Sequence, residues 1–555
     1  MARLDRLGSA KEVAQLGAVI GREFSHALLA AVVRKPEALQ SAIDRLIAAG
    51  LVFRQGVPPQ ATYIFKHALV QDAAYGTLLR EPRRALHARI AETLETQFVE
   101  IAENQPELLA RHCTEAGLIE KGALLWGKAG QRSLTRSALV EAIAQFTRAL
   151  NQLSSLPSTP ALRSEQIRLQ VAIIAPLIHV KGFAAPETKA AVDRSRLLIE
   201  QAKALGEPPE DPLLLFSVLF GFWIANLAAF NGDALREIAG QFLTLAEQQR
   251  TTVPLMIGHR LTGQSLLFTG NISVARVHLD RAIDFYNPVE HRQLTVRFGG
   301  DVRGLSHRSW ALWMLGYPDA ALGDAEFCIK DAREIGQAGT LIPALLLASY
   351  VPMFCGNYTV ANKQINEGIA LAGEKGVVFW KTAGSLLQSW IVAQAGEASD
   401  AVQAIIAANG AFRSTGATLH TPSSLSYLAK AYAELGKFDD AWRCIGEAMT
   451  AVEMTKERLF EAEVRRIAGE ISLMAPQRGA AKGEAYFKRA LAVARQQQAK
   501  SWELRAAMSM ARLWRDQGKP RQARELLAPI YGWFTEGFDT RDLKEAKALL
   551  DELAA

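Results

Sequence analysis

The stretch SSLSYLAKAYAELGKFDDAWRCIGEAM, residues 423–449, decides the fold of this 555-residue chain. Apolar residues recur there at three- and four-residue intervals on both sides of Gly436, namely Leu428, Ala429, Tyr432, Phe438, Ala441, Ile445 and Ala448. Such spacing places each set on one face of an amphipathic helix. A glycine between the two sets can end the first helix in the left-handed conformation, which other residues rarely adopt. The stretch therefore predicts two antiparallel helices joined by a tight turn.

Similar glycine-centred turns recur along the chain. They are centred on Gly270, Gly316, Gly356, Gly396, Gly436 and Gly518, with Gly479 as a weaker member. The spacing is roughly 40 residues, within the range of helical-pair repeats. Five positions after each of the first six glycines stands an alanine, which gives Ala275, Ala321, Ala361, Ala401, Ala441 and Ala523. We interpret this alanine as the first inward-facing residue of the second helix, where close packing requires a small side chain.

The unit around Gly436 resembles the tetratricopeptide repeat, a helical pair that stacks into extended arrays. The resemblance extends from about Pro160 to the C-terminus, although the period exceeds the roughly 34 residues typical of that repeat. Two Pro-rich segments, residues 154–161 and 206–212, are expected to be loops, and the first marks the start of the main array. We therefore predict a mainly α chain in which residues 154–555 form a tetratricopeptide-like solenoid with a capping helix.

The stretch GALLWGKAG, Gly122 to Gly130, matches much of the P-loop pattern for phosphate binding. That pattern requires Ser or Thr after the lysine, because the hydroxyl holds Mg²⁺, whereas Ala129 follows Lys128 here. If Gly117 is a repeat turn, the repeat register places Ala129 at a small packing position and Trp126 at a core position. We therefore expect one continuous helix with Lys128 exposed, and no nucleotide site.

Residues 1–100 have a different pattern. Amphipathic helical segments come first, followed by two β-type runs around a Gly/Pro turn and by another helical segment. Helices, a β-hairpin and a further helix together predict a winged-helix domain. Residues 101–153 are expected to be a helical adaptor that begins the repeat array. Because a winged helix can bind DNA or a protein, the fold alone assigns no function.

Several segments resemble the C-terminal half of large bacterial signalling proteins: AKEVAQLGAVIGREF, ATYIFKHALVQDAAY, LHARIAETLE and KGFAAPE, which begin at Ala10, Ala61, Leu86 and Lys181. In that family a class III adenylate/guanylate cyclase domain precedes a STAND-type ATPase module, a winged helix and a tetratricopeptide-like array. Residues 499–543 are similar to the family's ending. Neither the metal-binding carboxylates of the cyclase nor an upstream P-loop strand is found. We therefore expect a truncated relative, a split gene product or a misassigned start codon, without cyclase activity of its own.

The resemblance assigns a nucleotide-sensing role to His67. In STAND ATPases a winged-helix histidine contacts the bound ADP phosphates, and the segment IFKHAL places His67 at that position. The family often has an acidic residue next, whereas this chain has Ala68. The alternative is a structural histidine at a strand-to-helix junction that makes a local hydrogen bond.

Charge and composition narrow the function classes. The formal net charge is +6, from 63 basic and 57 acidic residues without a long block of either sign, which argues against an extended nucleic-acid surface. The tightest basic cluster is interpreted as a solvated helix face, with a phosphate-binding patch as the alternative; it comprises Arg80, Arg83, Arg84 and Arg89.

The spacing of the four cysteines and ten histidines matches no disulfide framework or metal motif. We expect a reducing cytoplasm, no metal and no cofactor.

One segment, Leu213 to Phe230, carries no charge and is about as long as a minimal membrane-spanning helix. Polar residues interrupt it and no basic anchor flanks it closely, so we favour a buried helix of the array over a membrane span. The N-terminal residues also lack the apolar core of a secretory signal.

The leading functional hypothesis is a non-catalytic protein-interaction and regulatory module of a cyclase/ATPase-type signalling system. Its partner would be a protein or peptide, such as a separate cyclase or ATPase chain, bound in the groove of the stacked helices. Two alternatives stay open: a transcription regulator that binds DNA through the winged helix, and a fragment of an adenylate or guanylate cyclase. Catalysis by this chain is not expected, because no Ser/His/Asp arrangement, paired carboxylate motif or metal constellation stands out.

Overall fold

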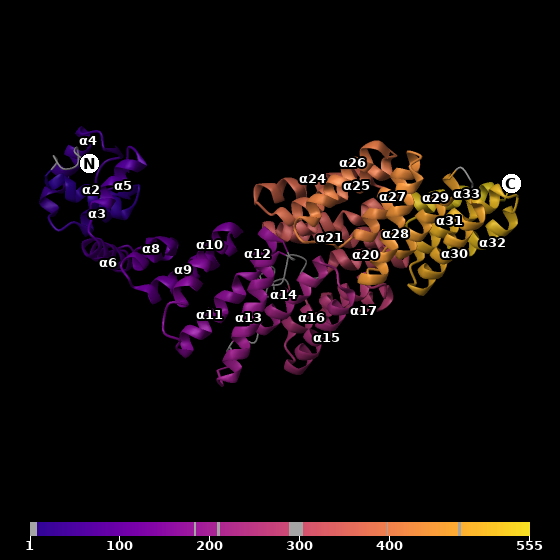
Figure 1. Cartoon of the computed structure of the whole chain (residues 1–555), viewed down its shortest axis with the longest axis horizontal. Helices are drawn as coiled ribbons and strands as arrows, with labels where there is room; N and C mark the ends of the chain where they lie inside the picture. Colours follow the sequence, from indigo (N-terminus) through magenta and orange to yellow (C-terminus); the bar gives the residue numbers. More distant parts are fainter. Residues whose placement is uncertain are drawn as a thin grey trace. The chain divides into compact units, whose positions relative to one another are not determined.

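The computed structural model describes residues 8–182, 185–207, 211, 213–287, 304–396, 398–475 and 479–554. The chain folds as two compact units (Figure 1). The first comprises residues 1–133 and 141–169, and the second comprises residues 134–140 and 170–555. The division into three domains that we predict from the sequence stays a prediction.

The first unit begins with helices that pack on a small antiparallel sheet of order β1-β3-β2. The β2–β3 hairpin was predicted, whereas β1 was not, because three residues are too few for an alternating pattern. Phe24 of β1 is buried and packs on the rings of Tyr63 and Phe65. The order of elements fits the winged-helix prediction: α2 (Ser9–Ile20), β1 (Glu23–Ser25), α3 (His26–Val32), η1 (Pro36–Ala38), α4 (Leu39–Ala48), β2 (Val52–Gln55), β3 (Thr62–Phe65) and α5 (Ala68–Gly76).

Helices then continue the first unit: α6 (Arg80–Gln97), α7 (Val99–Asn104), α8 (Pro106–Glu115), α9 (Ile119–Thr135), α10 (Leu139–Leu153) and α11 (Pro160–Ala172). Helix α9 passes without a break through the P-loop-like segment, with Lys128 exposed and Ala129 buried. A Cβ at Gly130 would lie 2.5 Å from the Phe146 ring, so glycine there allows α10 to pack closely. The segment is therefore a packed helix and lacks the exposed strand-to-helix loop that cradles phosphate.

The second unit is a tetratricopeptide-like solenoid of helical pairs (Figure 1). We call the first helix of each pair inner and the second outer. The inner helices are α12 (Ile174–Lys181), α14 (Leu213–Ala228), α16 (Thr252–Phe268), α20 (Leu305–Leu315), α22 (Ala338–Ala348) with α23 (Tyr350–Phe354), α25 (Val378–Ala395), α27 (Thr421–Glu434), α29 (Glu461–Met474) and α31 (Lys500–Asp516). The outer helices are α13 (Pro186–Ala204), α15 (Gly232–Gln249), α17 (Ile272–Asp284), α21 (Pro318–Ile335), α24 (Tyr358–Glu374), α26 (Ala398–Arg413), α28 (Phe438–Thr455), α30 (Ala480–Gln496) and α32 (Pro520–Tyr531), and α33 (Arg541–Glu552) follows them.

The repeat turns have one geometry. Their glycines, Gly270, Gly316, Gly356, Gly396, Gly436 and Gly518, have φ values between +74° and +95°. A side chain at such a φ is strained, because Cβ approaches the following carbonyl oxygen. The six alanines, Ala275, Ala321, Ala361, Ala401, Ala441 and Ala523, are fully buried on the outer helices. In the first unit, Gly117 has the same kind of turn, with a φ of +81°.

The solenoid winds tightly enough for its successive superhelical turns to touch. The Ala228 carbonyl at the end of α14 accepts hydrogen bonds from the N–H groups of Thr418 (2.8 Å) and Leu419 (3.0 Å). The Phe268 carbonyl at the end of α16 accepts from the Arg458 N–H at 2.9 Å. These contacts satisfy carbonyls that a helix end leaves without an intrahelical partner.

Hydrogen bonds to the last carbonyls of an inner helix recur closer to the C-terminus. The Trp313 carbonyl accepts from the Ser501 hydroxyl, and the Cys355 carbonyl accepts from the Arg541 N–H at 3.2 Å. In each case the end of an inner helix meets the start of the helix that lies five described pairs later. We call this line of contacts, at Ala228, Phe268, Trp313 and Phe354–Cys355, the seam.

A buried ionic cluster closes the C-terminal part of the seam. The Arg505 guanidinium binds Asp542 (Nε to Oδ2, 2.6 Å), donates to the Phe354 carbonyl (2.9 Å) and lies 3.7 Å from Glu463. Burial by itself raises the pKa of Glu463, but Arg466 and Arg505 outweigh burial and the pKa is lowered. The cluster thus stays ionised and holds three inner helices and α33 together.

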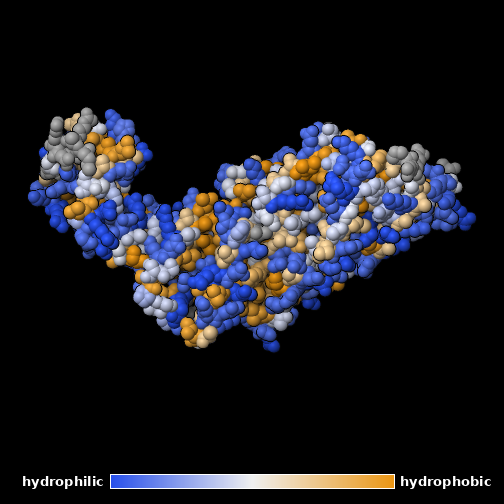
Figure 2. All heavy atoms as spheres, in the orientation of Figure 1, coloured by the Kyte–Doolittle hydropathy of each residue, from blue (hydrophilic) through white to orange (hydrophobic). Residues whose placement is uncertain are grey.

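Hydrophilic residues cover much of the surface at the C-terminal end of the second unit (Figure 2). On the face shown in Figure 2, hydrophilic residues predominate over the C-terminal helices. Arg512 of α31 and Glu545 of α33 form an exposed ion pair, at 2.8 Å. Helix α14, the uncharged segment of the sequence, is an inner helix, and its Phe216, Trp223 and Ala228 are buried. In the described parts of the chain, no helix is long and apolar enough to cross a membrane.

Candidate ligand-binding cavity

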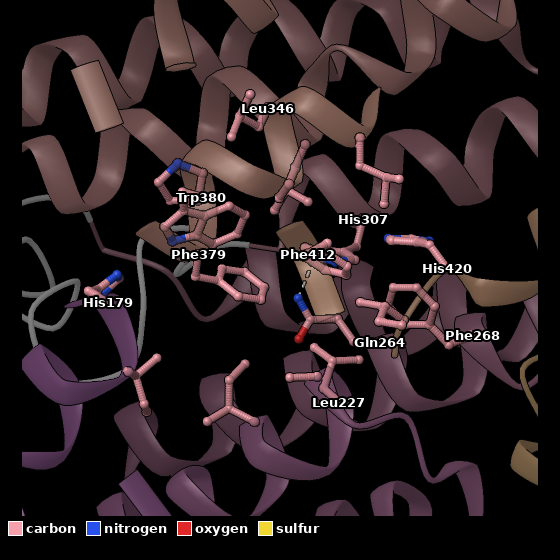
Figure 3. A pocket seen from close by; sticks show the side chains of 18 of the residues that line it. His179, Leu227, Gln264, Phe268, His307, Leu346, Phe379, Trp380, Phe412 and His420 are labelled. Carbon is pink, nitrogen blue, oxygen red and sulfur yellow. Dashed lines mark hydrogen bonds between the residues drawn. The ribbon is translucent and has the colours of Figure 1, made fainter. Parts of the chain in front are cut away.

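The inner helices of the second unit surround a cavity of about 120 Å³ (Figure 3). Its walls come from the inner helices α12, α14, α16, α20, α22, α23 and α25, from the outer helix α26, and from residues 419–420 before α27. The seam makes this enclosure, because the hydrogen bonds from residues 418–419 to Ala228 hold the α27 end of the winding against α14. One superhelical turn therefore wraps around a single space.

Aromatic rings make up much of the wall: Phe220, Trp223, Phe268, Trp310, Phe379 and Trp380. Two of the indoles have their N–H groups satisfied by protein acceptors. Trp223 donates to the Ser265 hydroxyl and Trp310 to the Leu347 carbonyl, both at 2.8 Å. These rings therefore present their apolar faces to the space, as expected of a pocket that recognises an apolar body.

One buried amide stands among the rings. Gln264 of α16 is 5% exposed, and its Nε2 lies 2.8 Å from Nδ1 of His307, a contact drawn as a dashed line in Figure 3. Its Oε1 points away from His307 and has no hydrogen-bond partner among the described residues. This oxygen is not sealed inside the protein, and Gln264 lines the cavity, so a hydrogen-bond donor on a ligand can reach it.

Two histidines of the wall are held neutral. Burial lowers the pKa of His179 to about 4, and burial together with nearby His307 lowers that of His420 to about 3. Nε2 of His420 lies 3.1 Å from the Tyr350 hydroxyl. At neutral pH these side chains add polar edges to the cavity but no charge.

A single formally charged residue, Arg260, belongs to the wall as the structure describes it, and no carboxylate does. Its guanidinium lies over the Phe220 ring, 5.6 Å from the centroid. The Glu457 carboxyl lies behind the wall, where it accepts the His420 backbone N–H at 2.9 Å. Burial raises the pKa of Glu457 to about 8, so this group is also largely neutral at pH 7.

The residues singled out in the sequence lie elsewhere. His67 precedes α5 at the strand-to-helix junction, with its imidazole exposed and without a hydrogen bond to the described residues. Of the basic cluster, Arg84 pairs with Glu81 at 3.4 Å. The repeat glycines and alanines do not line the cavity. Their roles, and the nucleotide role of His67, stay predictions.

The four cysteines are buried and free. Burial raises the pKa of Cys113 and Cys444 to about 11 and that of Cys355 to about 12, so these thiols are protonated at neutral pH. No group of three or more His, Cys, Asp or Glu side chains within the described ranges could hold a metal ion.

Sequence reasoning missed the cavity, because its lining residues are spread from residue 175 to residue 420. The available signal was the aromatic and histidine content of the inner helices, as in HRSW at residues 307–310 and FW at residues 379–380. That signal is typical of any buried helix. Only the winding brings these residues to one place.

No family model matches the chain. It is similar to an uncharacterized protein of Rhizobium meliloti (strain 1021), with 26% identity over 328 residues, 58% of this chain and 31% of that protein. The matched region thus spans less than a third of the relative's length.

Similar solved structures are also helical-repeat proteins. A Rap protein in complex with competence and sporulation factor has 13% identity and a TM-score of 0.46, over 70% of this chain and 99% of that chain. A Signal Transduction ATPase with Numerous Domains, with a tetratricopeptide repeat sensor, from Pyrococcus horikoshii has 13% identity and a TM-score of 0.26, over 98% and 64% of the two chains. At these TM-scores neither likeness assigns a function.

Proposed function

We propose that the chain is a non-catalytic binding and regulatory protein that recognises a protein or peptide partner on the inner surface of its second unit. One observation carries the proposal: side chains from successive inner helices converge on one cavity. An occupant there contacts helices from a whole superhelical turn at once. The regulatory system of cyclase and ATPase chains implied by the resemblance is part of the same proposal.

Regulation follows from how the cavity is enclosed. Its wall depends on the seam, where residues 418–419 bind the Ala228 carbonyl. A partner that binds the closed winding better than an opened one shifts the population toward the closed state. Occupancy of the cavity would thereby alter the outer helices, which a second protein can read.

Site-specific photocrosslinking tests the proposal. Val378, 48% exposed, begins α25 beside the cavity residues Phe379 and Trp380. Ile406, 51% exposed, is the matched position on outer helix α26. We expect benzoylphenylalanine at position 378, in the full chain expressed in its host, to crosslink a defined partner that position 406 does not capture. Equal labelling from both positions, or none from position 378, would contradict the proposal.

A further inference from the structure

The cavity is matched to a ligand of one ring. An engineered apolar cavity of about 150 Å³ binds benzene, and the cavity here measures about 120 Å³. Its rings and aliphatic side chains offer close contact to an aromatic body.

The polar groups of the wall define the rest of the ligand. Gln264 Oε1 is an acceptor without a partner among the described residues, while Nε2 of the same amide is engaged with His307. A ligand that carries one hydrogen-bond donor can therefore bind this oxygen, and Nδ1 of His420 is a second polar atom of the wall without a hydrogen-bond partner among the described residues. His179 and His420 are neutral at pH 7 and no carboxylate lines the described wall, so nothing there compensates a cationic ligand.

We propose that the cavity binds a compact neutral aromatic ring with one hydrogen-bond donor, a phenol in its simplest form, with the hydroxyl directed at Gln264 Oε1. The ring has two sources, a free small molecule or a tyrosine side chain of a bound peptide. The inference deepens the proposed function and rests on it, because it names the chemistry that the inner surface recognises.

Calorimetric titration of the full chain with phenol and toluene tests the ring and the donor together. The two probes have nearly the same size, but only phenol can donate to Gln264. We expect both to bind, and Gln264→Met to weaken phenol relative to toluene by about 3- to 10-fold, the range of one hydrogen bond. The ratio of the two affinities cancels any general effect of the substitution on the cavity. An unchanged ratio, or no binding of either probe at millimolar concentration, would overturn the inference.

A cavity-filling variant locates the site. Ala383 of α25 lines the cavity, whereas Ala407 of α26 is exposed. We expect Ala383→Leu to abolish binding of both probes and Ala407→Leu to leave it unchanged. If Ala383→Leu fails to fold, Ala175→Val on α12 provides the same test from another wall. Binding that survives a folded cavity-filling variant would place the probes elsewhere and overturn the inference.

Further probes test the charge of the ligand and whether it is a small molecule or a side chain of a peptide. Benzoate should bind more weakly than phenol; tighter binding of benzoate would assign the site to an anion near Arg260 instead and overturn the neutral-ring proposal. Gly-Tyr-Gly binding that exceeds phenol binding identifies a peptide source, and phenol binding alone identifies a small molecule. If crosslinking at position 378 captures a partner but no ring probe binds, the inference fails while the proposed function stands.

Discussion

The turns at Gly356 and Gly436 share a backbone conformation but not an environment. Their φ values are +84° and +74°. Gly356 lies on the seam, where a Cβ would stand 2.7 Å from Cβ of Arg541, whereas nothing lies within 4 Å of a Cβ at Gly436. The first turn thus needs glycine for its conformation and for space, and the second only for its conformation. The difference teaches that a repeat motif acquires a second role where superhelical turns meet.

Arg505 offers the largest test of the seam. Arg505→Ala leaves the Asp542 and Glu463 carboxylates buried without their shared cation, so we expect a loss of about 3–5 kcal/mol. The thermal unfolding midpoint should fall, and amide exchange should rise at α33. Arg512→Ala removes only an exposed pair with Glu545 and should cost about 0–1 kcal/mol. Similar losses in the two variants would show that the seam cluster adds no stability.

The two glycines give the next largest effect. Gly436→Ala should cost about 1–2 kcal/mol from the left-handed backbone alone. Gly356→Ala adds a clash with Arg541 and should cost about 1–3 kcal/mol more. Denaturant midpoints of the two variants, compared with the parent chain, measure the difference. Equal midpoints would mean that Arg541 can move away from the new Cβ at position 356 without a loss of folding free energy.

Glu457 tests the seam through pH. It stands beside Arg458, and burial raises its pKa from the ordinary 4.5 to about 8. Because the folded state holds this proton more tightly, the stability that Glu457 contributes is largest below pH 4.5 and falls as the pH rises toward 8, by at most about 1.4 kcal/mol per pH unit. Glu457→Gln keeps an acceptor for the His420 N–H and removes the ionisation.

We therefore expect the thermal midpoint of Glu457→Gln to fall less than that of the parent chain between about pH 5 and about pH 8. Glu447→Gln, at an exposed position of α28, is the control and should behave as the parent does. Parallel pH profiles for the parent chain and Glu457→Gln would show that this carboxyl does not titrate as its burial implies.

The smallest effect sharpens the comparison of the turns. Asparagine tolerates the left-handed conformation better than alanine does. Gly436→Asn should therefore cost less than Gly436→Ala, by about 0.5–1 kcal/mol. Gly356→Asn should remain as costly as Gly356→Ala, because Arg541 occupies the space that any side chain needs. A rescue by asparagine at both positions would remove the distinction between the two turns.

Much of the architecture could be predicted from local pattern. The helical pairs, the β2–β3 hairpin and the continuous helix through Lys128 follow from residues a few positions apart. Strand β1 could not be predicted, because its three residues extend only through pairing with β3. The cavity could not be predicted either, since Gln264 and His420 come to line one space only after one superhelical turn.

The sequence by itself determined where six of the turns between helices of the second unit lie, because glycine conformation and apolar periodicity act over a few residues. It also placed an alanine five positions after each of these turns, and all six alanines are buried. Only the tertiary structure decided how tightly the solenoid winds, which turns meet along the seam, and that the winding encloses an aromatic cavity around Gln264. Those features depend on small angles between successive pairs that accumulate along the chain, and no local pattern encodes their sum.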